Sequence, residues 1–384
     1  MTRSGGVDVV VIGGGVIGLS IAWQIARRGP AVTVVDDAQQ ARASWAGAGM
    51  LAPVSEVSYG EQALLALSLL SAEMYPQFVA DLEAVSGVDV GFRRCGSLLV
   101  AVDGDDDVEL SALFELQQRL GLVSERLGRR AARGLEPALA PGIRSGLVVE
   151  GDHQVDNRRL LEALRMAADR SGVCVERHTA SVMVDAGRVV GVRLEDNEVI
   201  AAGVVVVAAG CWSASIEGLA PRMRPPVRPV KGQILRLRAD PLRMPISRTV
   251  RGLVHGSRVY LVPRLNGEIV VGATVEERGF EAMVTAGGVC DLLRDARTVV
   301  PEIAECELVE FWAGLRPGSP RNAPALGRTP VDGLMMATGH HRNGILLAAV
   351  TASGIASVVC DGVTPPALLP FAPGDSEQSF EVVG

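Results

Sequence analysis

The fold is decided by the stretch VDVVVIGGGVIG, residues 7–18. Its first half is a run of β-branched residues, which is typical of a strand buried on both faces of a parallel sheet. After the glycines, Ile17, Ile21 and Ile25 recur four apart on one helical face, and Gly29-Pro30 predicts the end of that helix. A second β-branched run, residues 32–35, ends in Asp36. The pattern predicts a strand–helix–strand unit.

The glycines of this unit have the spacing of a dinucleotide-binding turn. Gly13 permits the tight turn, Gly15 lets the backbone approach a pyrophosphate at the helix N-terminus, and Gly18 allows close packing of helix on strand. The carboxylate of Asp36 can accept a hydrogen bond from a ribose hydroxyl and disfavours a 2′-phosphate. The unit therefore predicts binding of FAD or NAD, argues against NADP, and does not choose between the first two.

The next segment favours FAD. Residues 43–53, ASWAGAGMLAP, form a loop of small residues where an NAD domain would usually continue its strand–helix alternation. Small side chains let backbone amides close on a large ligand. A packed alanine–glycine turn without a ligand is the alternative.

Composition bounds the class of protein. The chain has 384 residues, 48% of them hydrophobic, and a net charge of −7. This length predicts two or three domains, and the acidic balance argues against a nucleic-acid partner. Six cysteines lack any CxxC pair and five histidines lack an HExxH pattern, so we expect no metal site and free thiols in a reducing compartment. We expect no membrane span and no signal peptide, and therefore a cytoplasmic protein.

The remaining pattern predicts two interleaved domains. Residues 61–85 and 344–359 have helical periodicity, residues 204–209 return to the first sheet, and residues 313–327 are expected to form a loop. Antiparallel strands are expected between residues 233 and 272, and a loose tail from residue 362. The predicted fold class is α/β, or α+β overall: a Rossmann-like domain formed by residues 1–87, 150–225 and 312–384, and an antiparallel-sheet substrate domain formed by residues 88–149 and 226–311.

Together these segments resemble the D-amino-acid oxidase family of flavoproteins, and within it the bacterial glycine oxidases of thiamine biosynthesis. The matching strings cover nearly the whole chain. They are VIGGGVIGLS (11–20), ASWAGAGMLAP (43–53), GDHQVDNRRL (151–160), YLVPR (260–264), FWAGLRP (311–317) and GHHRNGILL (339–347). The last two are the most specific.

The resemblance implies FAD bound without a covalent bond. Asp36 would bind the ribose, Val182 would lie on the adenine side, and a helix beginning at Gly344 would point its positive end at the flavin, stabilising the anionic reduced ring. The cofactor-binding residues implied are Gly13, Gly15, Val16, Ile17, Gly18, Asp36, Ser44, Ala46, Gly47, Gly49, Met50, Val182, Gly210, Arg342, Asn343, Gly344, Ile345 and Leu346.

The resemblance also implies catalytic positions. Arg316 and Tyr260 would clamp the carboxylate of an amino acid, because a guanidinium fork matches a carboxylate bidentately, and Arg342 would contact the amine end. Two residues depart from the family pattern: His341 stands where phenylalanine is usual, and Arg258 where histidine is common. The segment AVTA at residues 349–352 also replaces a familiar Pro-Ala-Thr-Gly. These departures can alter substrate choice without removing a chemical group.

The implied activity is oxidative deamination of glycine or a similar small amine by hydride transfer to flavin N5. Oxygen would be the acceptor, giving hydrogen peroxide, and the imine would serve thiamine thiazole synthesis or hydrolyse to glyoxylate and ammonia. The family implies a homo-oligomer, often a tetramer. Two alternatives stay open: an amine dehydrogenase of the same fold that passes electrons to a quinone or carrier, and a non-catalytic flavin-binding subunit. A plain NAD dehydrogenase is disfavoured by residues 43–53.

Overall fold

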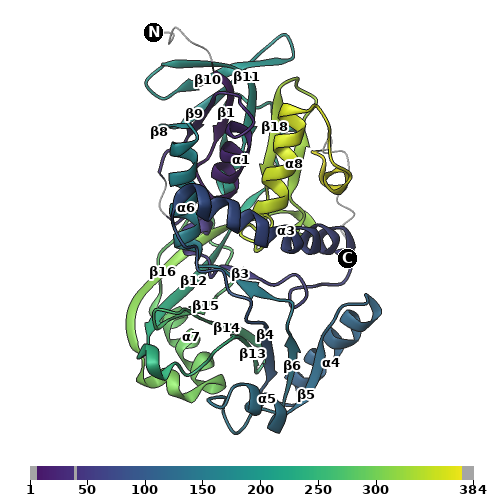
Figure 1. The fold of residues 1–384 in the computed structure, drawn as a ribbon, viewed down its shortest axis with the longest axis vertical. Helices are drawn as coiled ribbons and strands as arrows, with labels where there is room; N and C mark the ends of the chain where they lie inside the picture. Colours follow the sequence, from purple (N-terminus) through teal and green to yellow (C-terminus); the bar gives the residue numbers. More distant parts are fainter. Residues whose placement is uncertain (1–6, 39–40, 374–384) are drawn as a thin grey trace.

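The computed structural model describes residues 7–38 and 41–373, which form two bodies stacked along the long axis (Figure 1). The first body is built on a largely parallel sheet, in which β1 lies between β11 and β2, β18 pairs with β11, and β8 pairs with β2. The antiparallel strands β17, β10 and β9 extend it. The strands are β1 (Val7–Ile12), β2 (Val32–Val35), β8 (Cys174–Glu176), β9 (Ala180–Asp185), β10 (Arg188–Leu194), β11 (Val199–Val207), β17 (Ala325–Arg328) and β18 (Leu334–Thr338).

The first strand is buried on both faces, as its sequence predicts. Val9 and Val11 pack with the helices, whereas Val10 and Ile12 pack with the β9–β11 meander on the other side of the sheet. Because successive side chains of a strand point to opposite faces, an unbroken apolar run is the pattern that such a two-sided core requires.

Four helices cover the helical face of this sheet (Figure 1). They are α1 (Val16–Ala26), α3 (Gln62–Ser86), α6 (Asn157–Arg170) and α8 (Ala348–Cys360). Among the described residues, α3 is the one helix long and apolar enough to cross a membrane. It carries a buried stripe that includes Leu67, Tyr75 and Leu82 and packs into the core of the first body, and a core helix passes the same length and composition test.

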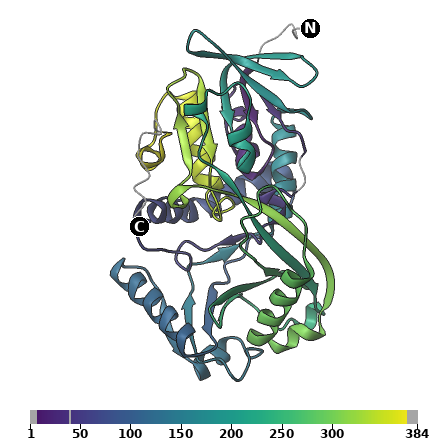
Figure 2. The same ribbon diagram turned by 180° about the vertical axis from the view of Figure 1, so that it is seen from behind.

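The second body is an eight-stranded sheet in the order β16-β12-β15-β14-β13-β4-β6-β5. All neighbours are antiparallel except β13 and β4, which run parallel. Seen from behind, β12 and β16 arch from this sheet toward the first body (Figure 2). The strands are β4 (Ser97–Ala101), β5 (Glu125–Gly128), β6 (Ser145–Val149), β12 (Arg228–Arg238), β13 (Thr249–Val254), β14 (Ser257–Pro263), β15 (Glu268–Gly272) and β16 (Glu307–Gly318); the helices are α4 (Gly104–Arg119), α5 (Arg129–Leu135) and α7 (Ala286–Val299).

Short elements join the two bodies. Residues 43–53, expected to be a loop, contain one helical turn, α2 (Ala43–Ala46), and a two-residue strand, β3 (Met50–Leu51), which pairs with β7 (His153–Gln154). Trp312 of β16 donates its indole N–H to the carbonyl of Ala46 at 3.1 Å. The second body therefore holds the loop that the sequence assigns to the cofactor.

Three local expectations are wrong. Residues 313–318 belong to β16 and are paired with β12 throughout. The regular pairing with β12 stabilises the strand despite its glycines and proline. Helix α8 begins at Ala348, four residues after Gly344, because turns occupy residues 341–347. The loose tail is in part packed: Leu368 and Phe371 enter the core, and Leu368 covers Gly354 of α8. The expected division into domains stays a prediction, and β16 runs continuously across its 311/312 boundary; residues 1–6 and 374–384 of that division lie outside the described residues.

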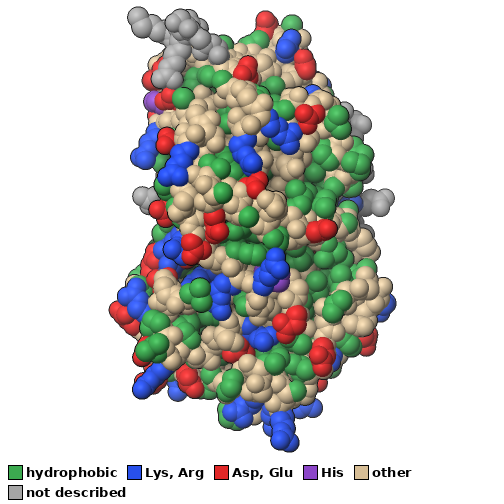
Figure 3. All heavy atoms as spheres, viewed as in Figure 1, with side chains coloured by type: hydrophobic (Ala, Val, Ile, Leu, Met, Phe, Trp, Pro, Cys, Tyr) green, Lys and Arg blue, Asp and Glu red, His purple; other side chains and the backbone are tan. Residues whose placement is uncertain are grey.

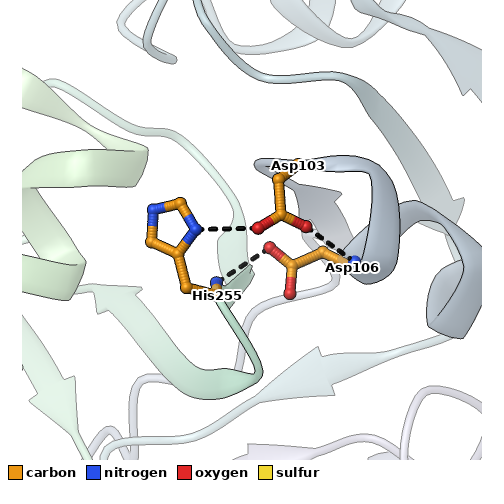
Figure 4. A group of neighbouring side chains, drawn as sticks. All are labelled: Asp103, Asp106 and His255. Atoms are coloured by element: carbon orange, nitrogen blue, oxygen red, sulfur yellow. Dashed lines mark hydrogen bonds and ion pairs between the residues drawn. The ribbon is translucent and has the colours of Figure 1, made fainter.

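Lys and Arg side chains are interspersed with Asp and Glu over the face of the molecule in Figure 3. One group of three potential metal ligands, Asp103, Asp106 and His255, occurs among the described residues (Figure 4). Asp103 caps α4 by accepting from the backbone N–H of Asp106 at 2.9 Å, and His255 Nδ1 lies 2.8 Å from the other Asp103 oxygen. Asp106 accepts from the backbone N–H groups of His255 and Gly256. These bonds attach the β13–β14 turn to the helix. The acids also stabilise the N-terminus of α4, a place where acidic side chains are common.

Candidate active site

A cavity of about 1510 Å³ lies between the two bodies. From the first body it is lined by the glycine turn after β1, the end of β2, residues 42–50 and residues 340–345. From the second body it is lined by residues of β12, β13, β14 and β16. The cavity therefore extends from Asp36 at one end to Tyr260 and Arg316 at the other.

The glycine turn has the close packing that the sequence predicts. Gly13 has φ +111°, and a Cβ there would lie 2.5 Å from the carbonyl oxygen of Ala208. A Cβ on Gly18 would lie 1.9 Å from the carbonyl oxygen of Gly13, so only glycine fits either position. Gly15 precedes α1 and faces the cavity, where the backbone of the turn is accessible to a pyrophosphate.

The loop of residues 43–50 is held against this turn by polar contacts. The Ser44 hydroxyl accepts from the backbone N–H of Val16 at 3.0 Å. Asn157 donates its side-chain amide to the carbonyls of Ser44 at 3.0 Å and Trp45 at 2.8 Å. The buried guanidinium of Arg264 donates to the carbonyl of Ala48 at 2.7 Å. Each of these bonds satisfies a backbone N–H or C=O group that has no partner within a helix or strand. Together the bonds fix the glycine-rich loop in one conformation.

Asp36 ends β2 and lines the cavity, where the ribose of a dinucleotide would lie. Arg42 donates to Asp36 Oδ2 at 2.8 Å, and both side chains are largely buried. Sequence reasoning did not assign Arg42 a role. The only signal for it was a cation six residues after the acid, too common a pattern to single out.

At the end of the cavity formed by the second body, two long side chains lie over glycines of the second sheet. Gly272 pairs with Tyr260 across β15 and β14, and the Tyr260 ring lies over it, so that a Cβ there would be 2.4 Å from the hydroxyl oxygen. The Arg316 guanidinium likewise lies over Gly232, 2.3 Å from where a Cβ would be. Two long side chains therefore lie flat across the sheet, and the charge of Arg316 acts on the Tyr260 hydroxyl.

Burial shapes the electrostatics of this end. Burial raises the pKa of the Tyr260 hydroxyl, and the charge of Arg316 offsets part of that rise. Burial also lowers the pKa of Arg316, although a guanidinium stays charged. Burial and the nearby charges of Arg342 and Arg316 lower the pKa of His341 to about 4, so this imidazole is neutral at pH 7. A neutral phenol, a cation and a neutral imidazole therefore face the same space.

An ion pair between Arg251 and Glu56 lies beside Tyr260 and Arg316. Arg251 is the cross-strand partner of Tyr260, and it donates to Glu56 Oε1 at 2.8 Å. Both members of the pair line the cavity. Sequence reasoning missed them, because the pairing of β13 with β14 and the approach of residues 53–58 are both tertiary. Arg258, the other departure from the family pattern, also lines the cavity and pairs with Glu109 of α4.

Most of the residues predicted from the sequence meet in this cavity. The predicted residues that line it are Gly13, Gly15, Val16, Ile17, Asp36, Ser44, Ala46, Gly47, Gly49, Met50, Gly210, Tyr260, Arg316, Arg342, Asn343, Gly344 and Ile345. Three others do not line it. Gly18 packs under the turn, Val182 is a core residue whose neighbours Ala180 and Ser181 line the cavity instead, and Leu346 is buried with its carbonyl accepting from Ser71.

Comparison with known proteins places this site in a family. The family model described as FAD dependent oxidoreductase (DAO) matches residues 8–358. The chain belongs to this family. The close-packed turn at Gly13 and Gly18 and the carboxylate of Asp36 fit FAD, the cofactor that the description of this family of oxidoreductases names.

Individual relatives are similar over most of this chain. The bifunctional protein ThiO/ThiG of Nostoc sp. is 34% identical over all of the chain and 56% of its own length, so the chain spans about half of that relative. The glycine oxidase of Pseudomonas putida is 35% identical, over 89% of this chain and 91% of the relative. The crystal structure of glycine oxidase from Geobacillus kaustophilus superposes with a TM-score of 0.89 at 32% identity, covering 96% of this chain and 98% of that one.

Proposed function

We propose that the protein oxidises glycine or a similar small amine or amino acid with oxygen as the electron acceptor. The observation that carries the proposal is the pair formed by Arg316 and Tyr260, which lie flat on a glycine floor and face the cavity that the glycine turn of the first body also lines. The names of the relatives, glycine oxidase among them, support the substrate class. The balanced reaction is glycine, oxygen and water giving glyoxylate, ammonia and hydrogen peroxide.

The roles of the residues follow from their chemistry. Arg316 binds the substrate carboxylate through its guanidinium fork, and the Tyr260 hydroxyl donates to the same carboxylate. FAD, when bound, accepts a hydride from the substrate α-carbon. The work of the protein is then to hold that carbon in one orientation, since a carboxylate fixed at two points restricts the rotation of a small molecule. Arg342 lies in the turn between β18 and α8 and lines the cavity. We assign it to the amine end of the substrate.

His341 and the Glu56–Arg251 pair distinguish this cavity from an apolar one. A neutral imidazole can accept or donate a hydrogen bond without adding charge. The carboxylate of Glu56 is near enough to Tyr260, Arg316 and His341 to affect the pKa of each. Such a lining suits a small polar substrate better than a long aliphatic one.

The proposal extends to the setting of the reaction. We propose a cytoplasmic enzyme, which the six free cysteines support, and a homo-oligomer, which the family resemblance supports. We also propose that the imine product serves thiamine thiazole synthesis, which the ThiO/ThiG relatives support. Absence of a nucleic-acid, membrane or metal partner stays a prediction.

The test begins with the FAD-loaded protein and glycine without oxygen. Bleaching of the flavin absorbance is expected, followed by peroxide formation when oxygen is admitted. Turnover of bulky D-amino acids a hundredfold faster than glycine and sarcosine would contradict the substrate class. Reduction by glycine without peroxide, together with turnover on an artificial acceptor, would favour the dehydrogenase alternative, and no reduction by any amine would favour the non-catalytic one.

Replacing Arg316 with alanine tests the carboxylate-binding role. We expect a loss of roughly 2–5 kcal/mol of transition-state stabilisation, because a buried charge pair with the substrate is removed. Tyr260→Phe removes one neutral donor and is expected to cost about 1 kcal/mol. A glycine KM unchanged in Arg316→Ala would rule out this assignment.

A further inference from the structure

Lys231 is the only lysine in a chain with 36 arginines. It lies on β12, one residue before Gly232, and its side chain is 1% exposed. Its Nζ atom lies 3.1 Å from Glu276 Oε2. An ion pair with a fully buried cation contributes little to stability, because removing that charge from water costs about as much as the attraction returns. The pair therefore needs an explanation other than stability.

Glu276 is the centre of a hydrogen-bond network. Its Oε1 atom accepts from the Thr274 hydroxyl at 2.6 Å and from the Gln233 amide at 2.7 Å. The backbones of Lys231 and Glu276 exchange two hydrogen bonds, of 2.9 and 3.0 Å. The backbone N–H of Gln233 donates to the Thr274 hydroxyl at 2.9 Å. Residues 274–276, which follow β15, are thereby attached to β12 by both side-chain and main-chain bonds.

This attached segment supports the Arg316 guanidinium. Arg316 Nη1 donates to the carbonyl of Thr274 at 3.2 Å and to the carbonyl of Lys231 at 3.4 Å. One carbonyl comes from each of the two segments that the Lys231–Glu276 pair joins. The Lys231–Glu276 pair therefore links the two segments whose carbonyls accept from the guanidinium that lies over Gly232.

We propose that Lys231 and Glu276 are positioning residues that hold Arg316 in the orientation in which it binds the substrate carboxylate. The inference rests on the proposed function, because it takes Arg316 as the carboxylate-binding group. Neither residue needs to touch the substrate: the pair acts on the two carbonyls, and the carbonyls act on the guanidinium.

The chain offers a matched control. Arg236 of β12 and Glu268 of β15 form another ion pair between β12 and a neighbouring segment, with Arg236 Nη1 2.8 Å from Glu268 Oε2. This pair has no contact with Arg316 among the hydrogen bonds and ion pairs of the described residues. Glu276→Gln and Glu268→Gln each replace a paired carboxylate by its neutral isostere, so the loss of an ion pair as such is common to both.

The experiment uses the FAD-loaded enzyme. The KM and kcat for glycine, the dissociation constant of acetate measured by flavin absorbance, and the Tm are compared for Glu276→Gln, Glu268→Gln and Arg316→Ala. For Glu276→Gln we expect the KM and the acetate dissociation constant to rise about 10-fold with kcat within about threefold, which is the pattern of lost carboxylate binding. For Glu268→Gln we expect a lower Tm with both constants within about twofold of wild type. Lys231→Met is expected to behave as Glu276→Gln does.

The outcomes separate the inference from the function on which it rests. If Arg316→Ala raises the KM but Glu276→Gln and Lys231→Met leave it at the wild-type value, the positioning role is wrong and the carboxylate assignment stands. Equal changes in Glu276→Gln and Glu268→Gln would also overturn the positioning role, because they would show a general effect of losing a buried pair. If Arg316→Ala itself leaves the KM unchanged, the proposed function fails first. Should Lys231→Met not fold, the isosteric Glu276→Gln carries the test.

Discussion

Gly232→Ala should damage substrate binding while leaving the fold intact. A Cβ at this position would lie 2.3 Å from Arg316 Nη2, 2.5 Å from Nη1 and 2.6 Å from Cζ. Non-bonded heavy atoms approach to about 3.5 Å, so the guanidinium has to move by roughly 1 Å. The backbone does not resist the change, since Gly232 is a strand residue without a positive φ.

The expected cost follows from that displacement. A 1 Å misplacement of a group that orients the substrate can lower the rate about 100-fold, which corresponds to roughly 2.7 kcal/mol at 1.36 kcal/mol for each factor of ten. Stability should change little, because the methyl group meets the far end of a long side chain instead of the backbone. The Tm should stay within a few degrees of wild type, and the FAD content should be unchanged.

The assay is oxygen consumption with glycine over a range of concentrations, together with Tm and flavin absorbance. Gly203→Ala on β11 is the control, because a Cβ there would meet nothing within 4 Å and the strand does not support Arg316. A kcat/KM for Gly232→Ala equal to that of Gly203→Ala would refute the argument that the glycine floor sets the position of Arg316.

Three further predictions concern other parts of the molecule. The stability of His341→Phe should depend less on pH than that of wild type. The pKa of His341 is about 4 in the folded protein and about 6.5 in the unfolded chain, so wild type loses stability as the pH falls through this window, by about 2 kcal/mol at pH 5. Equal losses of unfolding free energy between pH 7.5 and pH 5 in the two proteins would contradict this. Asp36→Asn should weaken FAD binding about 10- to 100-fold, because a charge-assisted hydrogen bond to the ribose is lost, and an unchanged dissociation constant in flavin titration would remove Asp36 from the site. Asp156→Ala should lower the free energy of unfolding by about 1 kcal/mol, because Asp156 caps α6 by accepting from the N–H groups of Arg158 and Arg159; urea unfolding that shows no loss would exclude the cap as a source of stability.

The first body shows how far local pattern reaches. The β-branched run of β1, the glycines at 13 and 18 and the carboxylate of Asp36 lie within thirty residues of one another, and each has a local steric or hydrogen-bonding reason. Their arrangement could be predicted because a strand–helix–strand unit has essentially one way to close. The specific strings 311–317 and 339–347 extended the prediction to residues that meet only in the tertiary structure.

The substrate end shows where local pattern stops. Arg316 was expected in a loop, yet it lies on β16, because the register of β16 with β12 stabilises a strand through its glycines and proline. The pair formed by Glu56 and Arg251 could not be predicted, since its members are nearly two hundred residues apart and neither lies in a distinctive motif. The partner of Lys231 could not be predicted either, because nothing in the sequence near it points to Glu276.

The amino-acid sequence by itself determined the nucleotide-binding unit, the cofactor class and the identity of many residues that line the cavity, because these depend on side-chain chemistry and on short-range backbone geometry. Only the tertiary structure decided how those residues are held: Arg316 over Gly232, Tyr260 over Gly272, and Lys231 against Glu276. The physical reason is that strand register brings together atoms far apart in the chain, and register is set by the summed packing of two whole sheet faces instead of by any one segment.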